Sequence, residues 1–77
     1  MKLSLFAQDQ ARAEIIEAAQ LINPYVADAI LDGSGRVRGW LIEEPASEGW
    51  IVRHADHEGP LWFYYATEAL EWIRANA

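Results

Sequence analysis

Three tryptophans recur at nearly even intervals in the second half of the chain, and each stands at or near the start of a short apolar run. Glycine or proline precedes every run, and polar segments of hairpin length separate the runs. Apolar runs about ten residues apart, with turn residues between them, are typical of consecutive antiparallel strands. The pattern therefore predicts strands over 36–43, 49–55 and 61–66. The tryptophans that mark these strands are Trp40, Trp50 and Trp62.

Helical periodicity predicts one helix before these strands and another after them. Over 8–22, small and apolar residues recur every three or four positions, with charged residues between them. Asp9 is the predicted N-cap of this helix, and Asn23 its predicted end, because a residue that precedes proline avoids the α region. Thr67 is the predicted cap of the final helix, over 68–76.

Two segments allow more than one interpretation. Ser4 is an alternative start for the first helix, and the alternation of residues 1–6 also allows a short strand. The segment 25–32 could begin as a helix, because Pro24 is favourable at a first helical position. It could also be a strand, since the following run 32–35 (Asp-Gly-Ser-Gly) has hairpin-turn chemistry.

The order of the predicted elements indicates a single α+β domain over 1–77. We expect an N-terminal helix, a three- to four-stranded antiparallel meander and a C-terminal helix, with both helices packed on one face of the sheet. The absence of cysteine excludes disulfides and thiolate metal sites. The ending 65–73 is typical of strand-to-helix junctions in small bacterial α+β proteins and carries no family motif.

The composition argues against several classes of function. A net charge of -6 disfavours nucleic-acid binding, which depends on Lys and Arg contacts to phosphates. No apolar run approaches the roughly 18 residues of a membrane span, and no signal-peptide pattern opens the chain. We therefore expect a soluble, cytoplasmic protein whose partner is another protein, with no nucleic-acid or membrane partner.

Catalytic and metal-binding motifs are also weak. The chain has no nucleophilic cysteine, no Gly-x-Ser-x-Gly elbow and no phosphate-binding Gly-Lys-Ser/Thr loop. His54, Asp56 and His57 resemble a metal site, but three ligands within four residues rarely close one without help from elsewhere. We expect no catalytic residues, no metal and no cofactor.

The faces of the predicted strands suggest where a partner could bind. Strand alternation places Val37, Gly39 and Leu41 on one face. The opposite face carries Arg and aromatic residues of the kind enriched at protein interfaces. Three outcomes are compatible with this composition. The face could be buried under a helix, it could contact a second copy in a homodimer, or it could contact a different protein.

Acidic residues cluster in the predicted connections. Glu43, Glu44 and Glu48 cluster in one predicted hairpin connection. Asp56 and Glu58 lie in the next connection, at the opposite end of a meander, with Asp28 and Asp32 near that second end. The leading hypothesis is a non-enzymatic protein-binding module that uses the aromatic face and an acidic rim. The alternative is a small acidic inhibitor or immunity-type protein that blocks a nucleic-acid-handling target by charge mimicry. The predicted contact residues are Trp40, Trp62, Tyr64, Arg36, Arg38, Glu43, Glu44 and Glu48.

Overall fold

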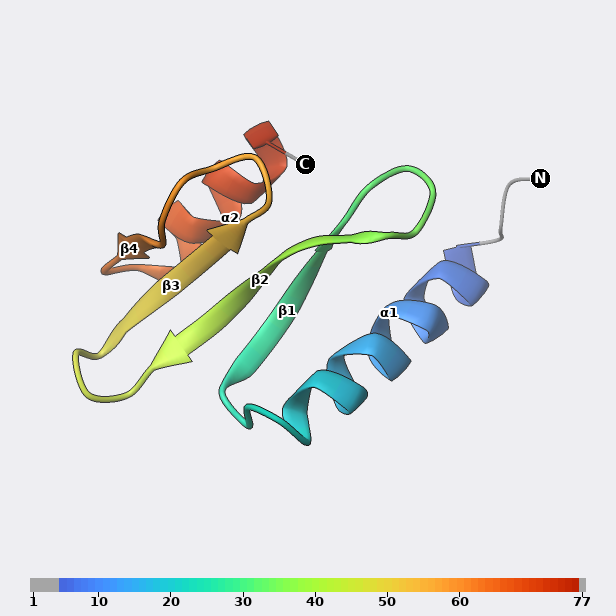
Figure 1. Ribbon diagram of the computed structural model, residues 1–77, viewed down its shortest axis with the longest axis horizontal. Coiled ribbons are helices and arrows are strands. Elements are labelled where there is room, and N and C mark those ends of the chain that lie inside the picture. The colour runs from blue at the N-terminus through green and yellow to red at the C-terminus, as the bar shows by residue number, and fades with distance from the viewer. Residues whose placement is uncertain (1–4, 77) are drawn as a thin grey trace.

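A computed structural model of the chain describes residues 5–76 (Figure 1). The four strands pair antiparallel in chain order, β1-β2-β3-β4, between the two helices. This confirms the predicted helix–meander–helix order and the α+β class, with four strands. The elements are α1 (Leu5–Gln20), β1 (Val26–Leu31), β2 (Val37–Glu44), β3 (Gly49–His54), β4 (Leu61–Phe63) and α2 (Ala66–Asn76).

The first helix begins earlier than the sequence predicted. α1 starts at Leu5, so Asp9 lies inside the helix and its prediction as the N-cap is wrong. No glycine or proline interrupts the segment before Asp9, and the helix therefore continues toward the N-terminus. Ser4 and most of the alternative strand over 1–6 fall outside the described residues. At the other end, the helix stops at Gln20, before the predicted stop at Asn23.

The ambiguous segment 25–32 is a strand, β1, joined to β2 by a tight hairpin. Asp32 organises the turn: its Oδ1 accepts hydrogen bonds from the backbone N–H of Ser34 (2.8 Å) and of Arg36 (3.0 Å). Gly35 adopts a φ of 84°, in the left-handed region that favours glycine. The turn chemistry thus decided between the two interpretations, because a helix through this segment could not have formed the hairpin.

The last strand is shorter than predicted, because the second helix starts sooner. β4 ends at Phe63, and the backbone N–H of Ala69 already donates a helical hydrogen bond to the carbonyl of Tyr65 (3.3 Å). Thr67 therefore lies in the first turn of α2, and its prediction as the cap is wrong. The predicted strand over 61–66 therefore consists of the three-residue strand β4, two connecting residues and the first residue of α2.

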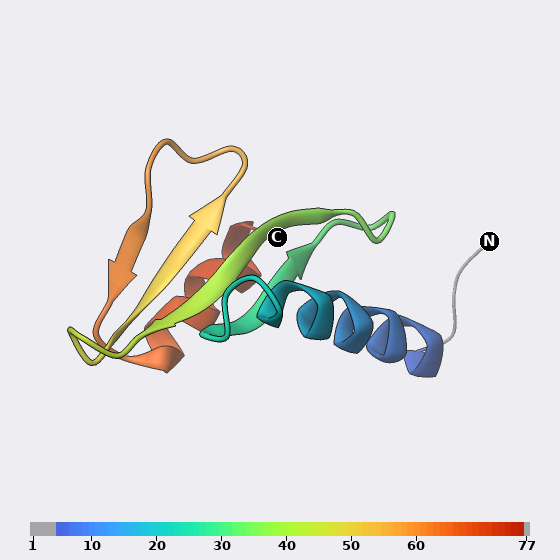
Figure 2. The ribbon, with the colours of Figure 1, turned by 60° about the horizontal axis from the view of Figure 1, so that its bottom comes forward.

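The core lies between the sheet and α2. Ala69 of α2 is fully buried against Leu41 and Val52, and Ile30 of β1 completes the cluster. α2 packs against β3 and β4, and in Figure 2 it lies behind β2. Since Leu41 and Val52 are directly paired across β2 and β3, their side chains share the face that α2 covers. This confirms the predicted alternation along β2.

α1 contacts the sheet from the other side. It lies beside β1 (Figure 1), and its apolar residues line a groove with Trp40 and Ile42. These two side chains flank Leu41 in β2 and point away from α2. The helices therefore differ from the expected arrangement on a single face. The physical reason is that both faces of the sheet are apolar, so a helix can pack against either face.

Within residues 5–76, neither helix has the length and apolar character needed to cross a lipid bilayer.

Candidate protein-binding face

The face of the sheet opposite α2 is the candidate site, and we call it the open face. Strand register brings its residues into rows: Trp40 pairs with Arg53, and Ile42 with Ile51. Ile51 pairs in turn with Trp62 of β4. Directly paired residues place their side chains on the same side of a sheet. The open face is therefore a mostly apolar surface across β2, β3 and β4, with Arg53 beside Trp40.

A groove of about 480 Å³ lies where the open face meets α1. Trp40 and Ile42 form its wall on the sheet. Residues about one helical turn apart form its wall on α1, and the turn that follows the helix extends this wall. Asn23 is the polar residue in an otherwise apolar lining. The lining residues are Ile15, Ala18, Ala19, Ile22, Asn23, Val26, Trp40 and Ile42.

The turn that follows α1 exposes two large aliphatic side chains beside this groove. Leu21 is 88% exposed and Ile22 is 90% exposed. Ile22 is the last residue of the predicted helix over 8–22. The helix ends at Gln20, however, so Ile22 leaves the helical stripe. The proline at position 24 was the signal in the sequence that could have identified this exposed end.

An aromatic cluster occupies the far side of the open face, on and after β4. Trp62 is 51% exposed and donates an Nε1–H hydrogen bond to the Ser47 hydroxyl (3.2 Å). Its ring lies edge-to-face with that of Tyr64 at 6.1 Å, and Tyr64 meets Tyr65 at 4.8 Å. Both tyrosines are more than half exposed. Trp50, in contrast, packs against the core on the α2 side and is not part of the site.

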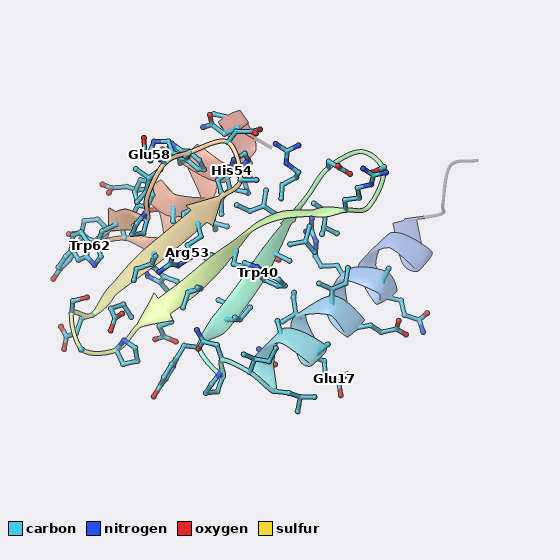
Figure 3. The ribbon with its side chains drawn as sticks, viewed as in Figure 1. Glu17, Trp40, Arg53, His54, Glu58 and Trp62 are labelled. Carbon is cyan, nitrogen blue, oxygen red and sulfur yellow. The ribbon has the colours of Figure 1, made fainter. Side chains whose placement is uncertain are left out.

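The two arginines predicted as contact residues, Arg36 and Arg38, have different surroundings in the structure. Arg38 forms an ion pair with Asp56 of the β3–β4 connection, which reduces its availability to a partner. Arg36 is exposed in the β1–β2 hairpin. Arg53 was not predicted as a contact residue, although Figure 3 places it beside Trp40 in front of the sheet. Arg38, Trp40 and Arg53 line a second hollow of about 300 Å³.

Of the three predicted glutamates, Glu43 and Glu44 end β2, and Glu48 lies in the β2–β3 connection; we call these three residues the acidic hairpin. Glu44 pairs with Gly49 and so belongs to the open face, whereas Glu43 pairs with Trp50 on the other side. Glu48 is exposed in the turn with a φ of 53°. The structure thus brings Glu44, Trp40 and Trp62 onto one face and leaves Glu43 on the other.

The acidic residues expected at the other end of the sheet do not all lie there. Asp56 and Asp32 lie at the same end of the sheet, as predicted, because Asp56 follows β3 and Asp32 precedes β2. Asp28 of β1 instead pairs with Leu41 of β2. Its Oδ1 lies 4.0 Å from Nε of Arg12 in α1. Arg12 nevertheless stays exposed on α1.

The two histidines pack against α2. His54 and His57 lie edge-on to Trp72, with ring centroids 5.5 and 5.8 Å away. Nδ1 of His54 accepts a hydrogen bond from the backbone N–H of Asp56 (3.1 Å). Among residues 5–76, no group of three potential ligands is arranged to hold a metal ion.

No protein-family model matches the chain, and neither a curated protein nor a solved structure matches it. Its function therefore has to be inferred from the residues and their arrangement.

Proposed function

We propose that this protein is a non-enzymatic, cytoplasmic binding module that contacts another protein through the open face and the acidic hairpin. The observation that carries the proposal is the exposure of large apolar side chains at both margins of one face. Ile22 lies at the α1 margin and Trp62 at the β4 margin, with Trp40 between them. Extended apolar surfaces of this kind mark interaction sites in proteins that are otherwise stable as monomers.

Contact with a partner would bury the exposed aromatic surface of this face. Trp62 is 51% exposed, and burying the rest of such a side chain contributes on the order of 2–3 kcal/mol. Tyr64 exposes a similar fraction and is already oriented by its contact with Trp62. Pre-oriented aromatic side chains lose little entropy on binding, which is why they dominate binding energy at interfaces.

The non-enzymatic part of the proposal is supported by the surroundings of the polar groups. His54 and His57 pack on Trp72, where they contribute to the packing of α2. The pKa of Asp32 is lowered by its hydrogen bond from the Ser34 side chain and by turn amides, and this reflects turn structure. Acid–base catalysis instead needs a titratable group held beside bound substrate in a recess.

A capture experiment tests the proposal. We expect a double variant, Trp62→Ala with Tyr64→Ala, to keep its fold and to lose a binding partner captured by the wild-type chain from a lysate. Val37→Ala is the matched control, because Val37 is also exposed but lies on the face that α2 covers in part. Equal capture by all three proteins would contradict the proposal. So would unfolding of the double variant, because those side chains would then be core.

The molar mass in solution tells which class of partner uses the face. Light scattering at two loading concentrations should give the monomer mass if the partner is a different protein. A homodimer at both concentrations would assign the face to a second copy. The charge-mimicry alternative draws on the net charge of -6. It ranks second because Asp28 and Asp56 lie against arginines of the same chain.

A further inference from the structure

We propose that the aromatic cluster on and after β4 binds an arginine side chain of the partner protein, with the guanidinium stacked on the indole of Trp62. The acidic hairpin supplies the counter-charge. This inference rests on the proposed function and names the chemistry of the partner. A guanidinium group stacks on aromatic faces and donates hydrogen bonds to carboxylates in its own plane, so it needs an exposed ring with carboxylates beside it.

The indole of Trp62 is exposed and is also held in one orientation. Its Nε1–H donates a hydrogen bond to the Ser47 hydroxyl (3.2 Å), and the ring covers Gly49. Trp62 nevertheless remains 51% exposed. A ring that is already fixed loses little entropy when a guanidinium stacks on it. Tryptophan is also the aromatic side chain that attracts cations most strongly.

Two tyrosines enlarge the exposed ring surface next to Trp62. The Tyr64 ring meets the indole edge-to-face at 6.1 Å, and the Tyr65 ring lies 4.8 Å from that of Tyr64. Both tyrosines are more than half exposed. Three exposed rings in mutual contact therefore offer apolar surface to the aliphatic stem of an arginine as well as to its guanidinium.

Strand register places two carboxylates beside the indole. Glu44 is paired with Gly49, the residue that the indole covers. Directly paired positions lie about 5 Å apart, so Glu44 adjoins the ring on the open face. Glu48 is exposed in the turn between Ser47 and Gly49, the two residues that contact the indole. Among residues 5–76, neither glutamate forms an ion pair.

The arginines of the open face lie at a distance from these carboxylates. Arg53 follows Gly49 by four residues in β3, which corresponds to about 13 Å along the strand. Figure 3 places Arg53 beside Trp40, with Trp62 at the outer margin of the sheet. Arg38 is engaged by Asp56. Exposed charges separated by more than about 8 Å are largely screened at physiological ionic strength, so the surroundings of the indole favour a cation.

A second copy of the chain is a poorer source of this arginine than a different protein. Each copy carries a net charge of -6, so two copies repel each other. A partner with a basic contact segment is instead attracted both by the net charge and by the carboxylates beside the indole.

The probe is a five-residue peptide with arginine at its centre, glycines on either side and blocked ends, titrated into isotope-labelled protein and followed by NMR. The indole N–H of Trp62 should shift in a saturable manner, with a Kd on the order of 1 mM for one stacked guanidinium and its charge-assisted hydrogen bonds. Replacing arginine with citrulline keeps the shape and removes the charge, and it should weaken binding at least about fivefold. A lysine peptide should bind about threefold more weakly, because an ammonium group is a point charge without a planar face.

Three single variants define the contact from the side of the protein. Glu44→Gln and Glu48→Gln should each weaken binding of the arginine peptide about threefold, because each removes one counter-charge. Trp62→Leu, read from the backbone amides of the hairpin, should weaken it about threefold or more, because the ring is lost. The dispersion of the NMR spectrum shows directly whether each variant is folded.

Glu43→Gln is the matched control. It makes the same change of charge in the same hairpin, but Glu43 pairs with Trp50 on the other face of the sheet. We expect it to change the affinity by less than about 1.5-fold, since an exposed charge outside the contact acts through screened solvent.

Several outcomes would overturn the inference. Equal binding of the citrulline or the lysine peptide would exclude recognition of a stacked guanidinium. Equal weakening by Glu43→Gln and Glu44→Gln would mean that the peptide responds to net charge alone. Absence of a shift at Trp62 with peptide on the order of 10 mM would exclude the site. A lysate capture that still depends on Trp62 and Tyr64 would then leave the proposed function standing without this partner chemistry.

Discussion

The indole of Trp62 lies directly over the backbone of Gly49, so that a Cβ on this glycine would approach the ring atoms to 2.5 Å. Gly49 is buried by this contact although it sits at the start of β3 beside a solvent-exposed hairpin. The ring is held in place by the hydrogen bond from Nε1 to Ser47. An aromatic side chain packed over a strand glycine covers backbone that would otherwise be exposed. The orientation of Trp62 on the open face thus depends on a residue without a side chain.

Gly49→Ala should displace the indole and lower the free energy of unfolding by about 1–2 kcal/mol, because the added methyl overpacks the contact. Urea unfolding followed by tryptophan fluorescence measures the loss. The same substitution in a Trp62→Ala background should cost clearly less, since the clashing ring is gone. Additive effects of the two substitutions would contradict the contact.

Gly39→Ala should be the most damaging glycine substitution in the chain. A Cβ at Gly39 would overlap the backbone carbonyl of Arg53 in the neighbouring strand, and this atom cannot move without breaking the β2–β3 pairing. We expect a loss of about 3 kcal/mol or more in the free energy of unfolding. Gly33→Ala is the control, because nothing lies within 4 Å of its added methyl. Its effect should stay within about 0.5 kcal/mol in the same thermal or urea assay.

Glu48→Gly should stabilise the protein. Glu48 has a φ of 53°, and a non-glycine residue pays about 1 kcal/mol or more in this left-handed region. Part of the gain is offset by the greater freedom of glycine in the unfolded chain, so the net increase should be roughly 0.5 kcal/mol. Glu43→Gly, in the regular part of β2, should instead be destabilising. A loss of stability for both variants would show that the strain at Glu48 is relieved by contacts of its side chain.

Trp50→Ala should destabilise the fold far more than Trp62→Ala. Trp50 packs against the core beneath α2, whereas half of the Trp62 side chain is in solvent. We expect losses of about 3 kcal/mol for Trp50 and about 1 kcal/mol for Trp62, measured by urea unfolding. The opposite order would place Trp62 in the core and remove it from the open face as a contact residue.

Acid should weaken the β1–β2 hairpin through Asp32. The Ser34 hydroxyl and the turn amides stabilise its carboxylate and hold the pKa of Asp32 below its ordinary value of 3.8. A group whose pKa is lower in the folded state contributes stability above pH 3.8, and this contribution disappears as the pH falls through the lower, folded value. Unfolding measured from pH 6 to pH 2 should therefore show a smaller acid-dependent loss for Asp32→Asn than for the wild type. Glu58→Gln, on the exposed β3–β4 connection, controls for the loss of one negative charge.

Strand alternation was predictable from the sequence, because it depends only on the backbone geometry of neighbouring residues. The assignment of Leu41 and Trp40 to opposite faces of the strand was therefore correct. Arg53, in contrast, was not predicted as a contact residue. Its position beside Trp40 follows from the β2–β3 register, and the register depends on the loop geometry of the hairpin as well as on the residue pattern.

The sequence by itself determined the order of the elements, the turns and the two apolar faces of the sheet, because local residue patterns encode strand and helix periods and turn geometry. Only the tertiary structure decided which face each helix covers. It placed α2 over Leu41 and α1 beside Trp40, and so left Ile22 and Trp62 exposed on one surface. The physical reason is that packing depends on the fit between surfaces far apart in the chain, and an apolar pattern is compatible with more than one such fit.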